Sequence, residues 1–173
     1  MMKLITIENR VSELLKFGAP KIFIENIGKV EELDFQVEDV EMAYFYLPQI
    51  SNYKIIKDFS LIPIFCSGET FYVYAYNDQI EKIIYFELEN DQIYTDYEKN
   101  WHLLLMDIMI QYFESEIDDG IEVNDFKNVG EKIAFDKAEQ LFDLLNLSVE
   151  EYNIKFNEKD KWRTEIAKKL NIL

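Results

Sequence analysis

The sequence contains few of the residues from which most catalytic and metal sites are built. Its 173 residues include one cysteine, Cys66, and one histidine, His102. A nucleophilic cysteine or serine needs a base within hydrogen-bond reach, most often a histidine. A zinc site needs several cysteine and histidine ligands, and a disulfide needs two cysteines. We therefore expect no internal disulfide and no metal site, and the sequence favours a protein that is not an enzyme.

Glycine and long apolar runs are also scarce. The five glycines are too dispersed to form a phosphate-binding loop, and no cofactor is expected. The densest apolar segment, LLLMDIMI (103–110), contains Asp107 and is far shorter than the roughly 20 residues of a membrane-spanning helix. The apolar stretch of the N-terminal MMKLITIENR is too short for a signal peptide. These features predict a cytoplasmic protein without a membrane partner.

Basic residues are few, since 18 Lys and Arg stand against 34 Asp and Glu, for a formal net charge of −16. Residues 31–125 carry 22 acidic and 4 basic side chains, whereas residues 153–173 carry 6 basic and 3 acidic ones. An acidic field repels phosphate backbones and attracts basic partners. We therefore expect a basic protein partner and no direct nucleic-acid binding. A general gain in solubility would explain the same net charge.

Apolar residues are abundant enough to build the core of one domain, because 49% of the chain is hydrophobic and 15% aromatic. The stretch IPIFCSGETFYVYAYN (62–77) predicts two strands that are joined by a turn at Ser67 and Gly68. Pro63 cannot donate a ladder hydrogen bond, so it requires an edge, a bulge or the start of the strand. A further turn leads into KIIYFELE (82–89), so that two consecutive hairpins are expected.

Helices are predicted on both sides of these strands. Apolar residues recur at helical spacing in residues 7–17, in residues 100–116, around Phe135 to Leu145, and from Trp162 to Leu170. Ser148 and Glu151 have the spacing of a capping box. KIFIE (21–25) and MAYFYLP (42–48) are expected to be short strands, and Gly120 to Gly130 a loop. The pattern predicts an α+β fold in a single domain, residues 1–173, with residues 153–173 as a C-terminal helical extension.

Three motifs are candidates for chemical sites. Ser67 lacks the first glycine of a G-x-S-x-G elbow, and residues 66–70 are better interpreted as a hairpin turn in which Gly68 adopts an unusual backbone conformation. ESEIDDG (114–120) fails the register of a calcium loop and is better interpreted as a helix end with a turn. A catalytic site with a pair of carboxylates stays possible. The sequence does not indicate which pair, because it contains 34 acidic residues.

The remaining candidate site is a surface on adjacent strands of the two hairpins. Tyrosine offers a large rigid contact area with a polar tip, and acids beside it suit a basic partner. The alternative is that this face lies under a helix, with the tyrosine hydroxyls at the rim. The predicted partner-binding residues are Tyr72, Tyr74, Tyr76, Tyr85, Glu87 and Glu89.

The order of these elements resembles the SUKH superfamily, which includes yeast cell-wall synthesis regulators and many bacterial immunity proteins. The resemblance covers roughly residues 8–150 and is sharpest over residues 59–113, in LIPIFCSGETFYVYAY, KIIYFELEND and the helix that follows. It implies a mixed, mostly antiparallel sheet flanked by helices, without catalytic residues. It also implies an antidote that binds a cognate toxin, often a nuclease, and blocks it.

We therefore expect a protein-binding module, namely an immunity protein that neutralises a basic toxin domain by occlusion. Two alternatives stay open. An intracellular regulatory or scaffold protein would have several partners of modest affinity, as the eukaryotic members suggest. A carboxylate-dependent hydrolase would have a deep pocket that holds two acids with separated protonation behaviour.

Overall fold

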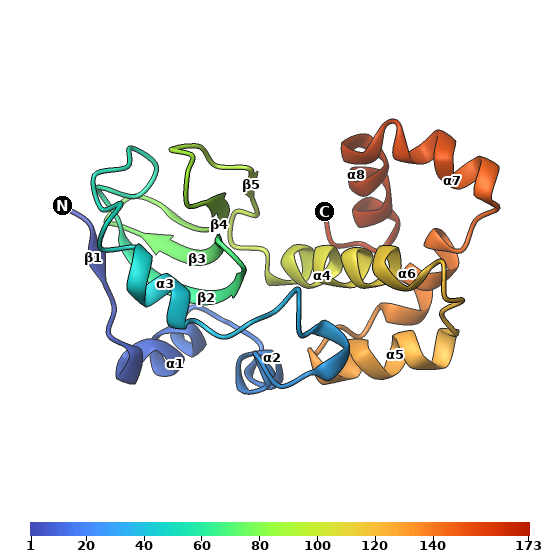
Figure 1. Cartoon of the computed structure of the whole chain (residues 1–173), viewed down its shortest axis with the longest axis horizontal. Coiled ribbons are helices and arrows are strands. Elements are labelled where there is room, and N and C mark those ends of the chain that lie inside the picture. The colour runs from blue at the N-terminus through green and yellow to red at the C-terminus, as the bar shows by residue number, and fades with distance from the viewer. The chain divides into compact units, whose positions relative to one another are not determined.

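The computed structural model describes residues 1–173 and contains eight α-helices, one 3-10 helix and five strands (Figure 1). The fold is α+β, as the sequence predicts. Contacts divide the chain into two compact units, Met1–Trp101 and His102–Leu173. The single domain over residues 1–173, with 153–173 as an extension, stays a prediction.

The first unit contains one mixed sheet in the order β1-β2-β3-β4-β5. The short strand β1 runs parallel to β2, and the other neighbours are antiparallel, so β2, β3 and β4 form the two predicted hairpins (Figure 1). The elements of this unit are β1 (Lys3–Leu4), α1 (Ile7–Lys16), α2 (Lys21–Asn26), η1 (Glu31–Leu33), α3 (Glu41–Tyr46), β2 (Ser60–Ser67), β3 (Thr70–Tyr76), β4 (Glu81–Glu87) and β5 (Thr95–Asp96).

Pro63 lies at a β-bulge, as its missing N–H requires. The register of β2 against β3 shifts between Pro63 and Phe65. On the outer side of β2, the buried side chain of Arg10 donates from Nε to the Pro63 carbonyl at 2.7 Å and from Nη2 to the Ile64 carbonyl. Helix α1 is thereby fixed to the sheet through a guanidinium group.

The sheet packs an apolar cluster against α3. Phe71, Val73 and Ala75 are alternate residues of β3 and point to this side, and Ala43 and Leu47 pack against them from α3 and its end. Figure 1 shows α3 lying alongside β2. Tyr46 adds its ring to the cluster at 6.4 Å from that of Phe71.

Two predicted strands are helices. KIFIE (21–25) belongs to α2, which follows Pro20 at its N-cap, and MAYFYLP (42–48) belongs largely to α3. Both runs are short and apolar, so their periodicity does not separate a strand from a buried helix. In α3 the buried positions are Ala43 and, one turn later, Leu47, which is the spacing of a helix face.

Helix α1 forms where it is predicted, but its buried face is different. Of the apolar residues at helical spacing, Leu14 is buried, whereas Ile7, Val11 and Leu15 remain exposed and Arg10 is buried instead. Residues 10 and 14 lie one turn apart, so the helix is rotated toward the guanidinium contact with β2.

The second unit is entirely helical, with α4 (Trp101–Glu116, its first residue lying in the first unit), α5 (Val123–Lys132), α6 (Ala138–Leu145), α7 (Val149–Phe156) and α8 (Lys159–Lys169). The expected loop between Gly120 and Gly130 is wrong, because α5 occupies most of it. An aromatic cluster joins α4, α5 and α6, in which Phe113, Phe126 and Phe142 lie within 6.0 Å of one another.

Polar contacts link the last two helices to α4. The predicted capping box is confirmed, since Ser148 and Glu151 exchange hydrogen bonds at the start of α7. Arg163 donates to Asp107 at 2.6 Å, and Glu114 accepts from Tyr152 and Lys159. None of the helices has both the length and the apolar character that crossing a membrane requires.

Replacing Arg10 should destabilise the first unit strongly. Arg10→Met keeps an unbranched apolar chain in place of the arginine stem but removes both donors to the bulge carbonyls. We expect the free energy of unfolding in urea to fall by about 3 kcal/mol, because each hydrogen bond from a charged group contributes roughly 1.5–3 kcal/mol and methionine burial offsets part of the loss. Lys3→Met, at an exposed position of β1, is the control, and equal stability of the two variants would contradict this role.

Gly130→Ala should also be destabilising, although alanine is the better helix former. A Cβ at this position would lie 2.6 Å from the Ala138 Cβ and 3.0 Å from the Phe135 carbonyl oxygen. We expect a loss of about 1–3 kcal/mol from overpacking, measured by thermal or urea unfolding. Asn128→Ala, at an exposed site of the same helix, should change stability by less than about 0.5 kcal/mol. If Gly130→Ala were as stable as the wild type, α5 and α6 would be able to move apart by the small distance that the added Cβ requires at little cost in free energy.

Candidate protein-binding surface

The predicted tyrosine face exists as a row of side chains, but its centre is buried. Tyr72 pairs with Tyr85 across β3 and β4, with stacked rings at 4.8 Å. Only 5% of Tyr72 and 1% of Tyr74 is exposed. Tyr74 stacks between Phe17 at 4.6 Å and Trp101 at 5.9 Å. Neither Tyr72 nor Tyr74 can therefore form a direct contact with a partner in this conformation.

The other four predicted residues keep accessible surface. Tyr76, Tyr85 and Glu87 are half-buried, and Glu89 is exposed. Burial raises the pKa of Tyr85, and the negative charge of Glu87 adds to the shift. Tyr85, Glu87 and Glu89 thus lie where the buried tyrosine row reaches the surface, and their role in partner binding stays a prediction.

The row continues to a tyrosine that the sequence pattern did not indicate. Rings pack from Phe65 to Tyr72 at 4.1 Å, to Tyr85 at 4.8 Å and to Tyr94 at 5.7 Å. Tyr94 is 44% exposed, and Asn90 donates to its hydroxyl at 2.9 Å and to Glu87 at 3.2 Å. The aromatic row therefore ends in an exposed ring held beside a carboxylate.

Three segments converge at this end of the sheet, around the turn between β2 and β3. The Ser67 hydroxyl donates to the Phe35 carbonyl at 3.1 Å, and the Gly68 N–H donates to a Glu38 carboxylate oxygen at 3.0 Å. On the other side of the turn, the Leu88 N–H donates to the Glu69 carbonyl at 2.9 Å. We name these three segments the hairpin-end surface: residues 31–41, the turn 67–70 and the loop 87–94.

The hairpin-end surface is acidic throughout. Its three segments contain ten Asp and Glu residues and no Lys or Arg. Most of these acids are exposed, and so are two aromatic rings, Phe35 at 83% and Tyr94 at 44%. Carboxylates around exposed aromatic rings provide both long-range attraction for a basic surface and apolar contact area at short range.

Sequence reasoning found only part of this surface. The acidic run of residues 31–41 was visible as part of the charge imbalance, but a phenylalanine within it was as consistent with a core position as with an exposed one. Phe35 lies far from the turn 67–70 in the sequence, so only the fold brings them together. Tyr94 had no alternating neighbours that would mark it as part of a strand face.

The hairpin expected at residues 66–70 is confirmed, with Gly68 and Glu69 as its turn and with Cys66, Ser67 and Thr70 as the ends of the paired strands. Gly68 has φ +57°, in the left-handed region that glycine accepts most readily. The Cys66 thiol is buried, and burial raises its pKa to about 12. A thiol with this pKa is protonated at neutral pH and is a poor nucleophile.

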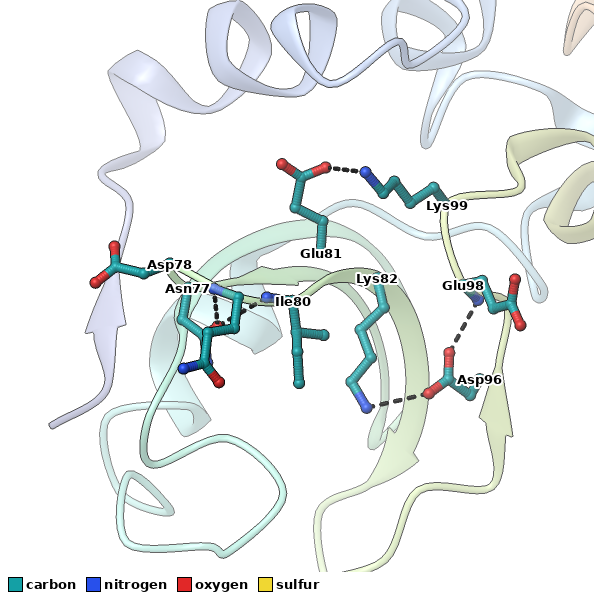
Figure 2. Close-up of a pocket in the computed structure, with 9 residues that line it drawn as sticks. Asn77, Asp78, Ile80, Glu81, Lys82, Asp96, Glu98 and Lys99 are labelled. Atoms are coloured by element: carbon teal, nitrogen blue, oxygen red, sulfur yellow. Dashed lines mark hydrogen bonds and ion pairs between the residues drawn. The ribbon is translucent and has the colours of Figure 1, made fainter.

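An open pocket of about 770 Å³ lies at the opposite end of the sheet. Figure 2 shows Lys82 reaching Asp96 and Lys99 reaching Glu81 across it, at 3.0 and 2.7 Å. The hydrogen bond from Lys99 holds the pKa of Glu81 below its usual range, so Glu81 is ionised at neutral pH and cannot serve as a proton donor. The lining residues are Asn77, Asp78, Gln79, Ile80, Glu81, Lys82, Asp96, Glu98 and Lys99.

The chain matches no protein-family model, no curated protein and no solved structure. The resemblance to the SUKH superfamily therefore stays a prediction from the sequence. The structure also contains no group of three or more His, Cys, Asp or Glu side chains that could hold a metal ion.

The folded protein should protect Cys66 from thiol reagents. At pH 8 an ordinary thiol is partly ionised, whereas the thiolate of Cys66 forms only near pH 12 and lies inside the sheet. We expect Ellman's reagent to leave the native protein unlabelled for hours and to label one thiol per chain in guanidinium chloride. Rapid labelling of the native protein at pH 8 would contradict the burial.

Proposed function

We propose that this chain is a non-enzymatic protein-binding module, an immunity protein of the SUKH type that neutralises a basic toxin domain by occlusion. The hairpin-end surface is the proposed contact region. Its ten acidic residues without a single basic residue, together with two exposed aromatic rings, carry the proposal. The toxin and its antidote would meet in the cytoplasm.

The charge of the surface suits a nuclease toxin in particular. A nuclease must bind a phosphate backbone, so its active-site cleft is lined with Lys and Arg. A carboxylate-rich surface is attracted to the same cleft and can cover it without any catalysis of its own. The SUKH resemblance supports this toxin class independently, because many of its bacterial members look like antidotes to nucleases.

The hairpin-end surface also has a firm scaffold. Glu38 is fixed twice, by a backbone bridge to Cys66 and by the contact of its carboxylate with the Gly68 N–H. Asn90 holds Glu87 and Tyr94 together on the other side of the turn. Because these groups are already positioned, binding would need little additional ordering.

The gene for a partner of this kind should lie next to the gene for this chain. We expect the gene immediately upstream to encode a large secreted polypeptide with a basic, toxic C-terminal domain, and we expect that purified domain to bind the chain. Co-expression should protect cells from the domain. A neighbouring gene without such a domain, or a domain that does not bind, would contradict the proposal.

Charge reversal on the hairpin-end surface should slow association with that toxin domain. Glu31, Asp34 and Glu69 are exposed and lie in two of the three segments. Changing all three to Lys should lower the association rate constant at least about tenfold at low salt and weaken its dependence on ionic strength. Stopped-flow or surface plasmon resonance measures both quantities.

The matched control changes the net charge by the same amount at a distant position in the sequence. Asp118, Asp119 and Asp143 are exposed in the second unit, and their triple change to Lys should have a much smaller effect. Equal slowing by both triple variants would show that net charge alone governs the encounter, and the hairpin-end surface would lose its proposed role.

A further inference from the structure

We infer that Phe35 is the anchor residue of the hairpin-end surface, and that its ring enters an apolar pocket bordered by Lys and Arg on the basic partner. This inference rests on the proposed function and names the chemistry of the partner at the same surface. The ring of Phe35 would supply much of the affinity, whereas the surrounding carboxylates would supply the long-range attraction.

The exposure of Phe35 is unusual for its residue type. The side chain is 83% exposed, the highest value among the aromatic residues of the chain, whereas Phe23, Phe65, Phe71, Phe86, Phe126 and Phe135 are almost fully buried. A phenylalanine gains more from removal from water than most side chains. In the free protein the ring of Phe35 stays in water. Its burial by a partner would therefore contribute this free energy to binding.

Hydrogen bonds position the backbone around Phe35. Its carbonyl accepts a hydrogen bond from the Ser67 hydroxyl at 3.1 Å. Phe35 also lies within a turn that is closed by the Val37 N–H, which donates to the Leu33 carbonyl at 2.8 Å. The Glu38 N–H then donates to the Cys66 carbonyl at 2.9 Å. A ring presented by a fixed backbone loses little entropy on binding, which is the property of anchor residues at interfaces.

The charges beside Phe35 define the partner. Asp34 precedes it directly, Glu31, Glu32 and Glu38 lie within four residues, and no basic residue occurs in residues 30–53. A pocket that accepts this ring must bring its rim close to these carboxylates. A rim of Lys and Arg would pair with them, whereas an acidic rim would be repelled.

Other exposed aromatic rings near α3 fit this role less well. Phe45 is 64% exposed but packs edge-on against Tyr46 at 4.8 Å, so part of its apolar surface already has a neighbour. It lies on α3, outside the three segments of the hairpin-end surface. Phe45 therefore serves as the matched control for a phenylalanine at a different exposed position.

The first experiment measures the kinetics of binding to the toxin domain encoded immediately upstream, with the full-length chain. Phe35→Ala should raise the dissociation rate constant about thirtyfold or more, as expected for an anchor residue, and change the association rate constant less than about threefold. Phe45→Ala should alter both rate constants less than about threefold. Both variants should melt like the wild type, because neither ring is buried.

The outcomes separate this inference from the proposed function. If the Lys variant of Glu31, Asp34 and Glu69 binds slowly while Phe35→Ala dissociates like the wild type, the surface binds the toxin but Phe35 is not its anchor. If the wild-type chain does not bind the toxin domain at all, the proposed function itself is wrong.

A photo-crosslinking experiment gives a second measurement that does not depend on the neighbouring gene. A chain with p-benzoylphenylalanine at position 35, and matched chains with it at positions 45 and 94, are expressed in the source cells and irradiated. Position 35 should give one dominant crosslink to a protein with an isoelectric point above about 8, on a peptide that contains Lys or Arg. No crosslink from position 35, or one to an acidic protein, would overturn the inference.

Discussion

The contact between Arg10 and the bulge in β2 is the interaction on which the first unit depends. Pro63 interrupts the outer edge of β2, and the register shift that follows leaves two consecutive carbonyls facing away from β3. A guanidinium group presents several N–H donors in one plane, so one side chain can satisfy both carbonyls. The requirement for this contact explains why α1 buries Arg10 and leaves Ile7, Val11 and Leu15 exposed.

The same edge of β2 also positions the candidate surface. Beyond the bulge, Glu38 pairs with Cys66, and this pairing carries Phe35 and the acidic segment to the turn between β2 and β3. On the far side of β3, the pairing of Thr70 with Glu87 brings the loop 87–94 to the same end of the sheet. Contacts that complete the sheet therefore also assemble the hairpin-end surface from three separate segments.

Sequence patterns predicted the elements whose pattern extends over many residues, and they failed where the apolar run was short. The alternation in β3, the capping box at Ser148 and the long helix α4 were all predictable. Residues 21–25 and 42–48 have too few positions to separate a strand from a helix. Tyr72 and Tyr74 alternate as a surface face would, yet aromatic rings cover them, which no local pattern reveals. The exposure of Phe35 depends on distant backbone contacts, so it could not be predicted at all.

The backbone groups along the outer edge of β2 already have partners, and this limits how other molecules can bind there. Lys3 and Leu4 pair with its first residues, Arg10 occupies the carbonyls of Pro63 and Ile64, and Glu38 pairs with Cys66 near its end. An incoming peptide would find no continuous ladder of free amide and carbonyl groups along this edge. Strand addition, in which a guest chain extends a sheet through its main chain, is therefore blocked here. Recognition at this side of the protein has to proceed through side chains, so the identity of each exposed side chain determines which partner binds.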